Sequence, residues 1–435
     1  MKINKTKIGQ KINRRGTKAA GVLGLTLAFG LVGGIGLPAA PARAAASWTT
    51  GNSTATGDQD NVAIASSRTG YTAIVWEDDR DSTPTDSVGS DVWVRLFHNG
   101  EPKFEKKVSA GGTAGKKWRH IQPDVGVDDL GRVVVVWADD PDGNGYYNIP
   151  IRIFDAAGKL LHSARANESS DGQQTKPSVA VDPDGSPPPG AGEKSDPYNL
   201  EVSYAVAWED RQGEAKPRIA MSRFVNATRR FEKVVSPTAG TNRNPDLAIT
   251  AGATTTLVWE EDADANGTYN IGLTRLDKSA NVVLKRTVAN ADVAGQQLAP
   301  AVAATFDGAF AVTWQGDKHI AWRGFTSTGK AVTGDVAVQT GEVTQPSIGI
   351  DGQSNVVVTW TTAGVDTFAQ GFAADGTSTG RLPRQQLSSN TEGRQEGLVP
   401  AVNANGEVAV ALTDDADGNS QDQIHLGFGL TTTTW

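Results

Sequence analysis

The chain has 435 residues, no cysteine and a formal net charge of −8. Without cysteine it can form neither disulfides nor thiolate metal sites, so its fold depends on packing and, where a metal is involved, on hard cations. The negative charge argues against nucleic acid as the main partner, because affinity for nucleic acid comes chiefly from neutralising phosphates.

Residues 1–46 have the pattern of a secretory signal peptide. Lysines and arginines precede an apolar run of Gly, Ala and Leu at residues 19–37, and small residues around Ala44 offer a cleavage site. We therefore predict a secreted, extracellular mature chain with no membrane span after cleavage. The alternative is a retained N-terminal anchor. Arg14 and Arg15 leave the twin-arginine export route open beside the general one.

A tryptophan that follows a run of β-forming residues recurs along the chain, roughly every 50 to 70 residues, as in propeller repeats. Acidic residues follow it in most copies, and a seventh copy carries Leu412 in its place. The six tryptophans are Trp76, Trp137, Trp208, Trp259, Trp314 and Trp360. The repeat predicts an all-β fold, a single seven-bladed β-propeller of four-stranded antiparallel blades over residues 47–435. We expect it to be a monomer.

Each repeat shows four strands. A proline before the tryptophan is expected to begin the first strand, since proline lacks the N–H that a strand ladder needs; examples are Pro123, Pro245 and Pro400. The tryptophan closes the second strand, and the fourth strand is weak and polar, as suits an outer edge. Arginines of the third strand, such as Arg95 and Arg275, are expected to pair with the acids that follow the tryptophans.

The two ends of the propeller region predict how the ring closes. The last repeat ends after its third strand, at residues 423–428. Residues 47–52 stand where a fourth strand would precede the first repeat. We therefore expect the N-terminal strand to complete blade seven, which removes the free edges of an open sheet. In the third repeat, the Pro- and Gly-rich residues 182–197 are expected to form a surface loop.

The loops after the second strand carry oxygen side chains in a fixed spacing, D-x-D-x-N-G-x-x-N. Oxygen ligands around a sharp turn are what Ca²⁺ requires, so these loops are candidate metal sites. The candidate ligands are Asp140, Asp142, Asn144 and Asn148 in the second repeat, Asp262, Asp264, Asn266 and Asn270 in the fourth, and Asp415, Asp417 and Asn419 in the seventh.

These loops resemble the calcium hairpins of integrin α-subunit propellers. The resemblance implies a bound Ca²⁺, with weak affinity because Asn148 and Asn270 stand where that family has an aspartate. No glutamate follows at the twelfth position, so millimolar calcium is the expected range. The alternative is that Asp, Asn and Gly here only build hairpin turns.

The whole repeat resembles the tryptophan-containing propeller repeats of secreted bacterial proteins and, loosely, the sialidase-like superfamily. The S-x-D-x-G-x-x-W box of sialidases is absent from the sequence. The resemblance therefore implies a fold and leaves the activity open.

Two hypotheses for function remain. In the first, the propeller is a binding module for extracellular glycan or protein, stabilised by calcium, with its loops as the recognition surface; Trp118 and Arg119 are candidate ligand contacts. In the alternative, it is a glycosidase or lyase that uses acids on the channel face, with Asp124, Asp246 and His120 as candidate catalytic groups.

Overall fold

The computed structural model describes residues 47–81, 89–111, 118–185, 201–213, 216–362, 366–380, 382–387, 394–415 and 421–432. These residues belong to one compact unit, Ala44–Trp435. The predicted signal peptide at 1–46, most of the loop 182–197, and the candidate ligands Asp417 and Asn419 lie outside the described residues. In the described part of the chain, no helix is long and apolar enough to cross a membrane.

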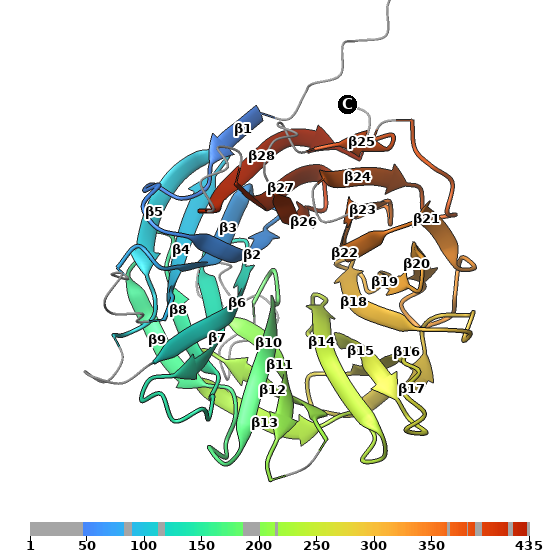
Figure 1. Ribbon diagram of the computed structural model, residues 1–435, viewed down its shortest axis with the longest axis horizontal. Coiled ribbons are helices and arrows are strands. Elements are labelled where there is room, and N and C mark those ends of the chain that lie inside the picture. Colours follow the sequence, from blue (N-terminus) through green and yellow to red (C-terminus); the bar gives the residue numbers. More distant parts are fainter. Residues whose placement is uncertain are drawn as a thin grey trace, which may run out of the picture. The chain divides into compact units, whose positions relative to one another are not determined.

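The elements form seven antiparallel sheets of four strands each, arranged as the predicted seven-bladed propeller (Figure 1). The first strand of each blade is innermost and contacts the first strand of the next blade, and β26 contacts β2 again. Blade one is β2 (Gln59–Ser66), β3 (Tyr71–Asp78), β4 (Asp91–His98) and β5 (Glu101–Lys107); blade two is β6 (Arg119–Val127), β7 (Val133–Asp140), β8 (Pro150–Phe154) and β9 (Leu160–Arg165); blade three is β10 (Gln173–Val181), β11 (Ser203–Arg211), β12 (Arg218–Val225) and β13 (Thr228–Val234).

The strands of the remaining blades follow in chain order, except that the N-terminal strand belongs to blade seven. Blade four is β14 (Thr241–Ile249), β15 (Thr255–Asp262), β16 (Asn270–Leu276) and β17 (Val282–Val288); blade five is β18 (Gln297–Ala304), β19 (Phe310–Gly316), β20 (His319–Phe325) and β21 (Val336–Thr340); blade six is β22 (Val343–Ile350), β23 (Val356–Thr362), β24 (Asp366–Phe372) and β25 (Gln385–Gln386); blade seven is β26 (Gln395–Val402), β27 (Glu407–Asp414), β28 (Gln423–Thr431) and β1 (Ser47–Thr50).

The hydrophobic core lies between blades. Each apolar cluster combines side chains of two neighbouring blades, and each repeat tryptophan belongs to the cluster shared with the preceding blade. All six are at most 1% exposed. Leu412 takes the corresponding place between blades six and seven. The repeated tryptophans therefore pack neighbouring blades against each other.

The N-terminal strand closes the ring, as predicted. β1 pairs with β28 in antiparallel register, with Ser47 opposite Phe428 and Thr50 opposite His425. Trp48 packs against the cluster between blades six and seven. The first and last strands of the propeller thus share one sheet (Figure 1).

The prediction that the prolines begin the inner strands is wrong. Pro123 is the fifth residue of β6 and lies in a β-bulge between Ile121 and Asp124, where the register with β7 shifts. A bulge tolerates proline because its residues leave the hydrogen-bonded ladder. In blade seven the bulge lies between Glu396 and Val399, so Pro400 is not its counterpart.

The closure predicts cooperative loss of stability on truncation. We expect a propeller that starts at Gly51 to unfold in one transition at a lower Tm than a propeller that starts at Ser47, because the loss of β1 leaves β28 as an open edge. Calorimetry of the two chains measures this difference. Equal melting temperatures would show that β1 contributes nothing to closure.

Candidate functional site

The inner strands share a left-handed bulge residue. At this position the backbone φ lies between 47° and 65°, a region that non-glycine residues adopt only at a cost. We call these residues the bulge ring; they are Asn61, Gln122, Lys176, Asn244, Ala299, Gln345 and Gly397. The end of the blades where they lie, at which inner strands begin and second strands end, is termed the loop face.

Acids that follow the tryptophans cap the bulge ring of the next blade. Gln122 N–H donates to Glu77 Oε1 at 2.7 Å. Asn244 N–H and Ala299 N–H donate in the same way to Glu209 and Glu260, each at 2.8 Å. Each acid therefore joins its own blade to the following one.

Two blades without this acid use a glutamine of the bulge ring instead. Gln122 Oε1 accepts the N–H of Lys176 at 2.9 Å, and Gln345 Oε1 accepts the N–H of Gly397 at 3.1 Å. A bulge frees an N–H from the ladder, and a buried N–H without an acceptor is costly. At these five blade junctions the acceptor is either a carboxylate or an amide.

The acids following the tryptophans therefore do not pair with the third-strand arginines, and that prediction is wrong. Arg95 donates to the carbonyl of Gly51 at 2.9 Å, and its ion pair is with Glu105 of the outer strand. Arg275 lies over the ring of Phe310, with 4.9 Å between the guanidinium carbon and the ring centroid. These arginines tie the outer parts of the blades together.

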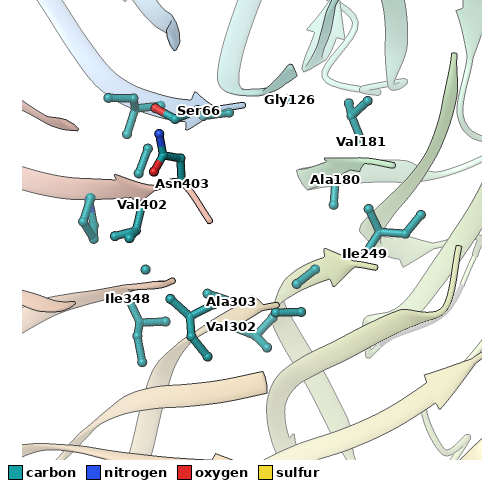
Figure 2. Close-up of a pocket in the computed structure, with 18 of the residues that line it drawn as sticks. Ser66, Gly126, Ala180, Val181, Ile249, Val302, Ala303, Ile348, Val402 and Asn403 are labelled. Carbon is teal, nitrogen blue, oxygen red and sulfur yellow. The ribbon is translucent and has the colours of Figure 1, made fainter. Parts of the chain in front are cut away.

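A cavity of about 430 Å³ lies on the propeller axis, lined by the inner strands of all seven blades. Figure 2 shows aliphatic side chains around this space, among them Val181, Ile249, Val302, Ile348 and Val402. The described charged residues that line it are Arg68, Asp124, Asp246 and Asp351. Its wall is therefore mainly apolar, with a few polar groups near its ends.

Asp124 and Asp246 lie at the end of this cavity nearest the loop face, and Ser178 stands between them. Ser178 Oγ donates to Asp246 Oδ1 at 2.8 Å, and Asp124 Oδ2 accepts the N–H of Val179 at 2.7 Å. Asp246 Oδ2 likewise accepts the N–H of Val302, at 2.7 Å. We call the three side chains on adjacent blades the acid arc, consisting of Asp124, Ser178 and Asp246.

Burial determines the ionisation of the acid arc. It raises the pKa of Asp124 to about 7; the charge of Asp246 raises it as well, while N–H donors from Val179 and Val125 lower it. Burial also raises the pKa of Asp246. Near neutral pH the arc therefore changes its charge, an uncommon property for aspartates.

His120 lies apart from the acid arc. It is 1% exposed, its Nδ1 contacts Asp139 Oδ1, and its ring lies 4.8 Å from that of Trp118. Asp139 also accepts the indole N–H of Trp137 at 3.0 Å. Of the three candidate catalytic residues, the fold brings Asp124 and Asp246 together, and His120 belongs to the packing of blade two.

The loops of blades two and four have the same hydrogen-bond pattern. Both Asp140 oxygens accept loop N–H groups, from Asn144 at 3.0 Å and Gly145 at 2.9 Å. Asp142 Oδ1 accepts the same Asn144 N–H at 3.3 Å, so the two carboxylates converge. The fourth blade repeats these contacts with Asp262, Asp264, Asn266 and Gly267.

Each of these loops also rests on the next blade. Gln173 Nε2 donates to the carbonyl of Gly145 at 2.8 Å, and Gln296 Nε2 to that of Gly267 at 2.8 Å. Gly145 has φ +82° and Gly267 φ +84°, a left-handed geometry that glycine adopts most easily. Asn148 Oδ1, a candidate ligand, accepts from Asn167 Nδ2 at 2.7 Å.

The remaining candidate positions lie around the same face. Asn270 Oδ1 accepts from Asn290 Nδ2 at 2.8 Å, as Asn148 does in blade two. Arg119 stands opposite Asp140 in the pairing of β6 with β7. In the seventh blade, Asp415 N–H donates to the carbonyl of Arg394 at 3.0 Å, and its loop partners lie outside the described residues.

The far end of the cavity is crossed by a contact that sequence reasoning missed. Arg68, after β2, lies over the ring of Phe306, after β18, with 4.1 Å between guanidinium carbon and ring centroid. The carboxylate of Asp129 accepts the backbone N–H of Arg68 at 3.0 Å and the Nε–H of Arg68 at 2.7 Å. Blades one and five are not neighbours, so this contact spans the mouth. No local pattern marks such a pair.

Comparisons with known proteins show similarity of fold. No family model matches the chain and no curated protein does. Similar solved structures include a NanB sialidase mutant from Streptococcus pneumoniae (11% identity, TM-score 0.46, 87% of this chain and 69% of that one) and a leech intramolecular trans-sialidase (11%, 0.43, 88% and 68%). An α-L-arabinofuranosidase mutant from Fusarium graminearum is similar at 10% identity (0.48, 71% and 92%). At these identities the similarity concerns the propeller fold alone.

The raised pKa of Asp124 predicts a pH-dependent stability. Folded Asp124 keeps a proton up to about pH 7, whereas the unfolded chain releases it near its ordinary value of 3.8. The free energy of unfolding should therefore decrease as the pH rises from about 4 to about 7, by at most about 4 kcal/mol. Asp124→Asn cannot ionise, and its amide can still accept from Val179. We expect this variant to match wild type at pH 4 and to exceed it at pH 8, measured by urea unfolding.

Ser347→Ala serves as the control for this measurement. Ser347 follows the bulge of β22 as Asp124 follows that of β6, and it has no titratable group. Its substitution should change stability equally at every pH. A difference between wild type and Asp124→Asn that does not vary with pH would contradict the raised pKa.

Proposed function

We propose that this chain is a secreted, extracellular binding module that recognises a glycan or a protein through its loop face. The observation that supports this proposal is the pair of matching loops at residues 140–148 and 262–270. Both are ordered by their own hydrogen bonds and by a glutamine of the next blade. Loops that are rigid before binding lose less conformational entropy when they engage a ligand.

Side chains of the loop face suit recognition. Tyr146 is 55% exposed at the tip of the blade-two loop. In blade four, Arg243 lies over the ring of Tyr269, with 4.1 Å between guanidinium carbon and ring centroid. Tyrosine offers an apolar ring and a hydroxyl group together, which is why it is frequent at binding surfaces. A sugar ring or a protein loop can use both.

The alternative is a glycosidase or lyase that acts through Asp124 and Asp246. Two carboxyls with different environments can serve as acid and base, and a pKa of about 7 for Asp124 suits a proton donor. Both carboxyls, however, accept backbone N–H groups of the following blade. This structural role accounts for them without catalysis, and we therefore favour the binding module.

Binding can be tested on an array of glycans and purified extracellular proteins. We expect Tyr146→Ala to weaken binding of the recovered ligand about tenfold, or about 1.4 kcal/mol, as measured by calorimetry. Val283→Ala is the control, since Val283 is 54% exposed on an outer strand away from the loop face. Ligand binding that is indifferent to Tyr146→Ala would place recognition elsewhere, and turnover of a bound glycan would favour the enzyme.

We also propose that Ca²⁺ stabilises the two loops. The donor set fits a hard cation, since Asp140, Asp142 and Asn144 offer oxygens and no sulfur or nitrogen ligand is needed. Asp140 and Asp142 converge on one N–H, at 3.0 Å and 3.3 Å. Each side-chain oxygen of this set already accepts one hydrogen bond within the loop, and each keeps a second lone pair that a metal can use. A cation would relieve the repulsion between the carboxylates.

The calcium proposal predicts a rise in Tm with added Ca²⁺. At ten times Kd, one site should add about 1.4 kcal/mol, because the ion binds the folded chain. Asp140→Ala with Asp262→Ala should abolish this response, measured by calorimetry with and without chelator. Asp155→Ala with Asp277→Ala is the control, because these aspartates also cap tight turns in the same two blades. A wild-type Tm indifferent to calcium and chelator would mean that the loops are turns alone.

A further inference from the structure

The axial cavity has the features of a second binding site, separate from the loop face. Its volume of about 430 Å³ falls within the range of small-molecule pockets, roughly 300 to 1,000 Å³. The contact of Arg68 with Phe306 crosses one end. The acid arc occupies the other end. Aliphatic side chains form much of the wall, as Val181, Ile249 and Val302 show (Figure 2).

We propose that this cavity binds a small organic ammonium ion, with the nitrogen between Asp124 and Asp246 and an apolar body against the aliphatic wall. The site does not depend on the proposed loop-face function. Ammonium N–H groups form charge-assisted hydrogen bonds to carboxylates, which are about twice as strong as neutral ones. The apolar body would gain from burial in proportion to the area removed from water.

The charges around the cavity favour a cation. The charge of Arg68 is paired with Asp129. Asp351 accepts hydrogen bonds from Asn355 in its own turn and from the hydroxyl of Thr432 near the end of the chain. Asp124 and Asp246 then remain as the charged groups that face the space near the loop face, among the described residues that line it. No described basic side chain of the lining stands beside them, so a cationic ligand would supply the missing counter-charge.

Both oxygens of Asp124 accept backbone hydrogen bonds, Oδ1 from the N–H of Val125 at 2.9 Å and Oδ2 from the N–H of Val179 at 2.7 Å. Ser178 has a single hydroxyl proton, and it donates this proton to Asp246 at 2.8 Å. Ser178 also lies beside Asp124, and burial raises the pKa of Asp124 to about 7, so a proton is held there below neutral pH. An ammonium ion can replace that proton, because it brings both a positive charge and several donors. Binding should then release a proton from Asp124.

The apolar wall distinguishes this ligand from more polar ones. A free sugar would place most of its hydroxyls against valine, isoleucine and alanine side chains, and a buried hydroxyl without a partner costs free energy. A bare metal ion would leave the wall without an apolar partner. An anion would meet Asp124 and Asp246 directly. An alkylammonium ion suits both the acid arc and the wall.

The test is calorimetric titration of the full propeller with hexylammonium and with its neutral analogue hexanol. We expect hexylammonium to bind and hexanol to bind at least tenfold more weakly. Affinity for hexylammonium should rise about tenfold from pH 6 to pH 8, because Asp124 ionises over that interval. The same titration in buffers of different ionisation enthalpy measures the proton that Asp124 releases.

Two variants and a control assign the effect to the acid arc. Asp246→Asn should weaken hexylammonium binding more than tenfold, and Asp124→Asn should remove its pH dependence. Ser347→Ala should leave affinity unchanged, since Ser347 lines the same cavity outside the arc. Thermal unfolding of each variant confirms that it is folded. Equal affinity for hexanol, equal affinity for potassium ion, no binding at pH 8, or full affinity in Asp246→Asn would each overturn the proposal.

Discussion

Contact between neighbouring blades is the constraint on which this structure depends. A four-stranded blade has two faces, and neither can be buried within the blade itself. Each repeat tryptophan fills one of these interfaces by packing against the preceding blade. The acid beside it reaches the other way, toward the bulge of the following blade, as Glu209 does for Asn244. One short segment thus joins its blade to both neighbouring blades.

This double contact gives the acids next to the tryptophans a structural role. The bulge turns the inner strand but frees an N–H, which needs an acceptor in a buried position. In blades two and six, which have no acid directly after the tryptophan, a glutamine of the bulge ring takes over, as Gln122 does between blades two and three. The chemical requirement is an oxygen at this point, and the residue type can vary from blade to blade.

The sequence predicted most of the fold and only part of the candidate site. Strand number, blade number and closure by Ser47–Thr50 follow from local patterns, and the pairing of β1 with β28 confirms the closure. The bulge was missed because proline indicates a break in the ladder without showing whether the strand starts there. The partners of Glu77 and Glu260 lie 45 and 39 residues further along the chain. Alternating patterns within a strand carry no information about such contacts.

The acid arc was foreseen only in its two aspartates. Ser178 occupies the same position after the bulge of β10, and the hydroxyl that joins Asp124 to Asp246 depends on three blades standing side by side. The same applies to Arg68 and Phe306, which meet across the ring from blades one and five. Pairs of this kind arise from the closed ring, and they become visible only once the blades are placed.

Some polar groups around the ring maintain the fold, and others are suited to binding a ligand. Each blade uses the same positions, and in blades two to four one of these positions carries the acid arc. The slot after the bulge carries Asp124, Ser178 and Asp246 there and Ser347 in blade six, whereas blades one, five and seven carry Ala63, Ala301 and Val399. The two matching loops also belong to blades two and four. Packing alone would be met by small or apolar residues in these slots, so the two aspartates of blades two and four are where a ligand of the axial cavity is best sought.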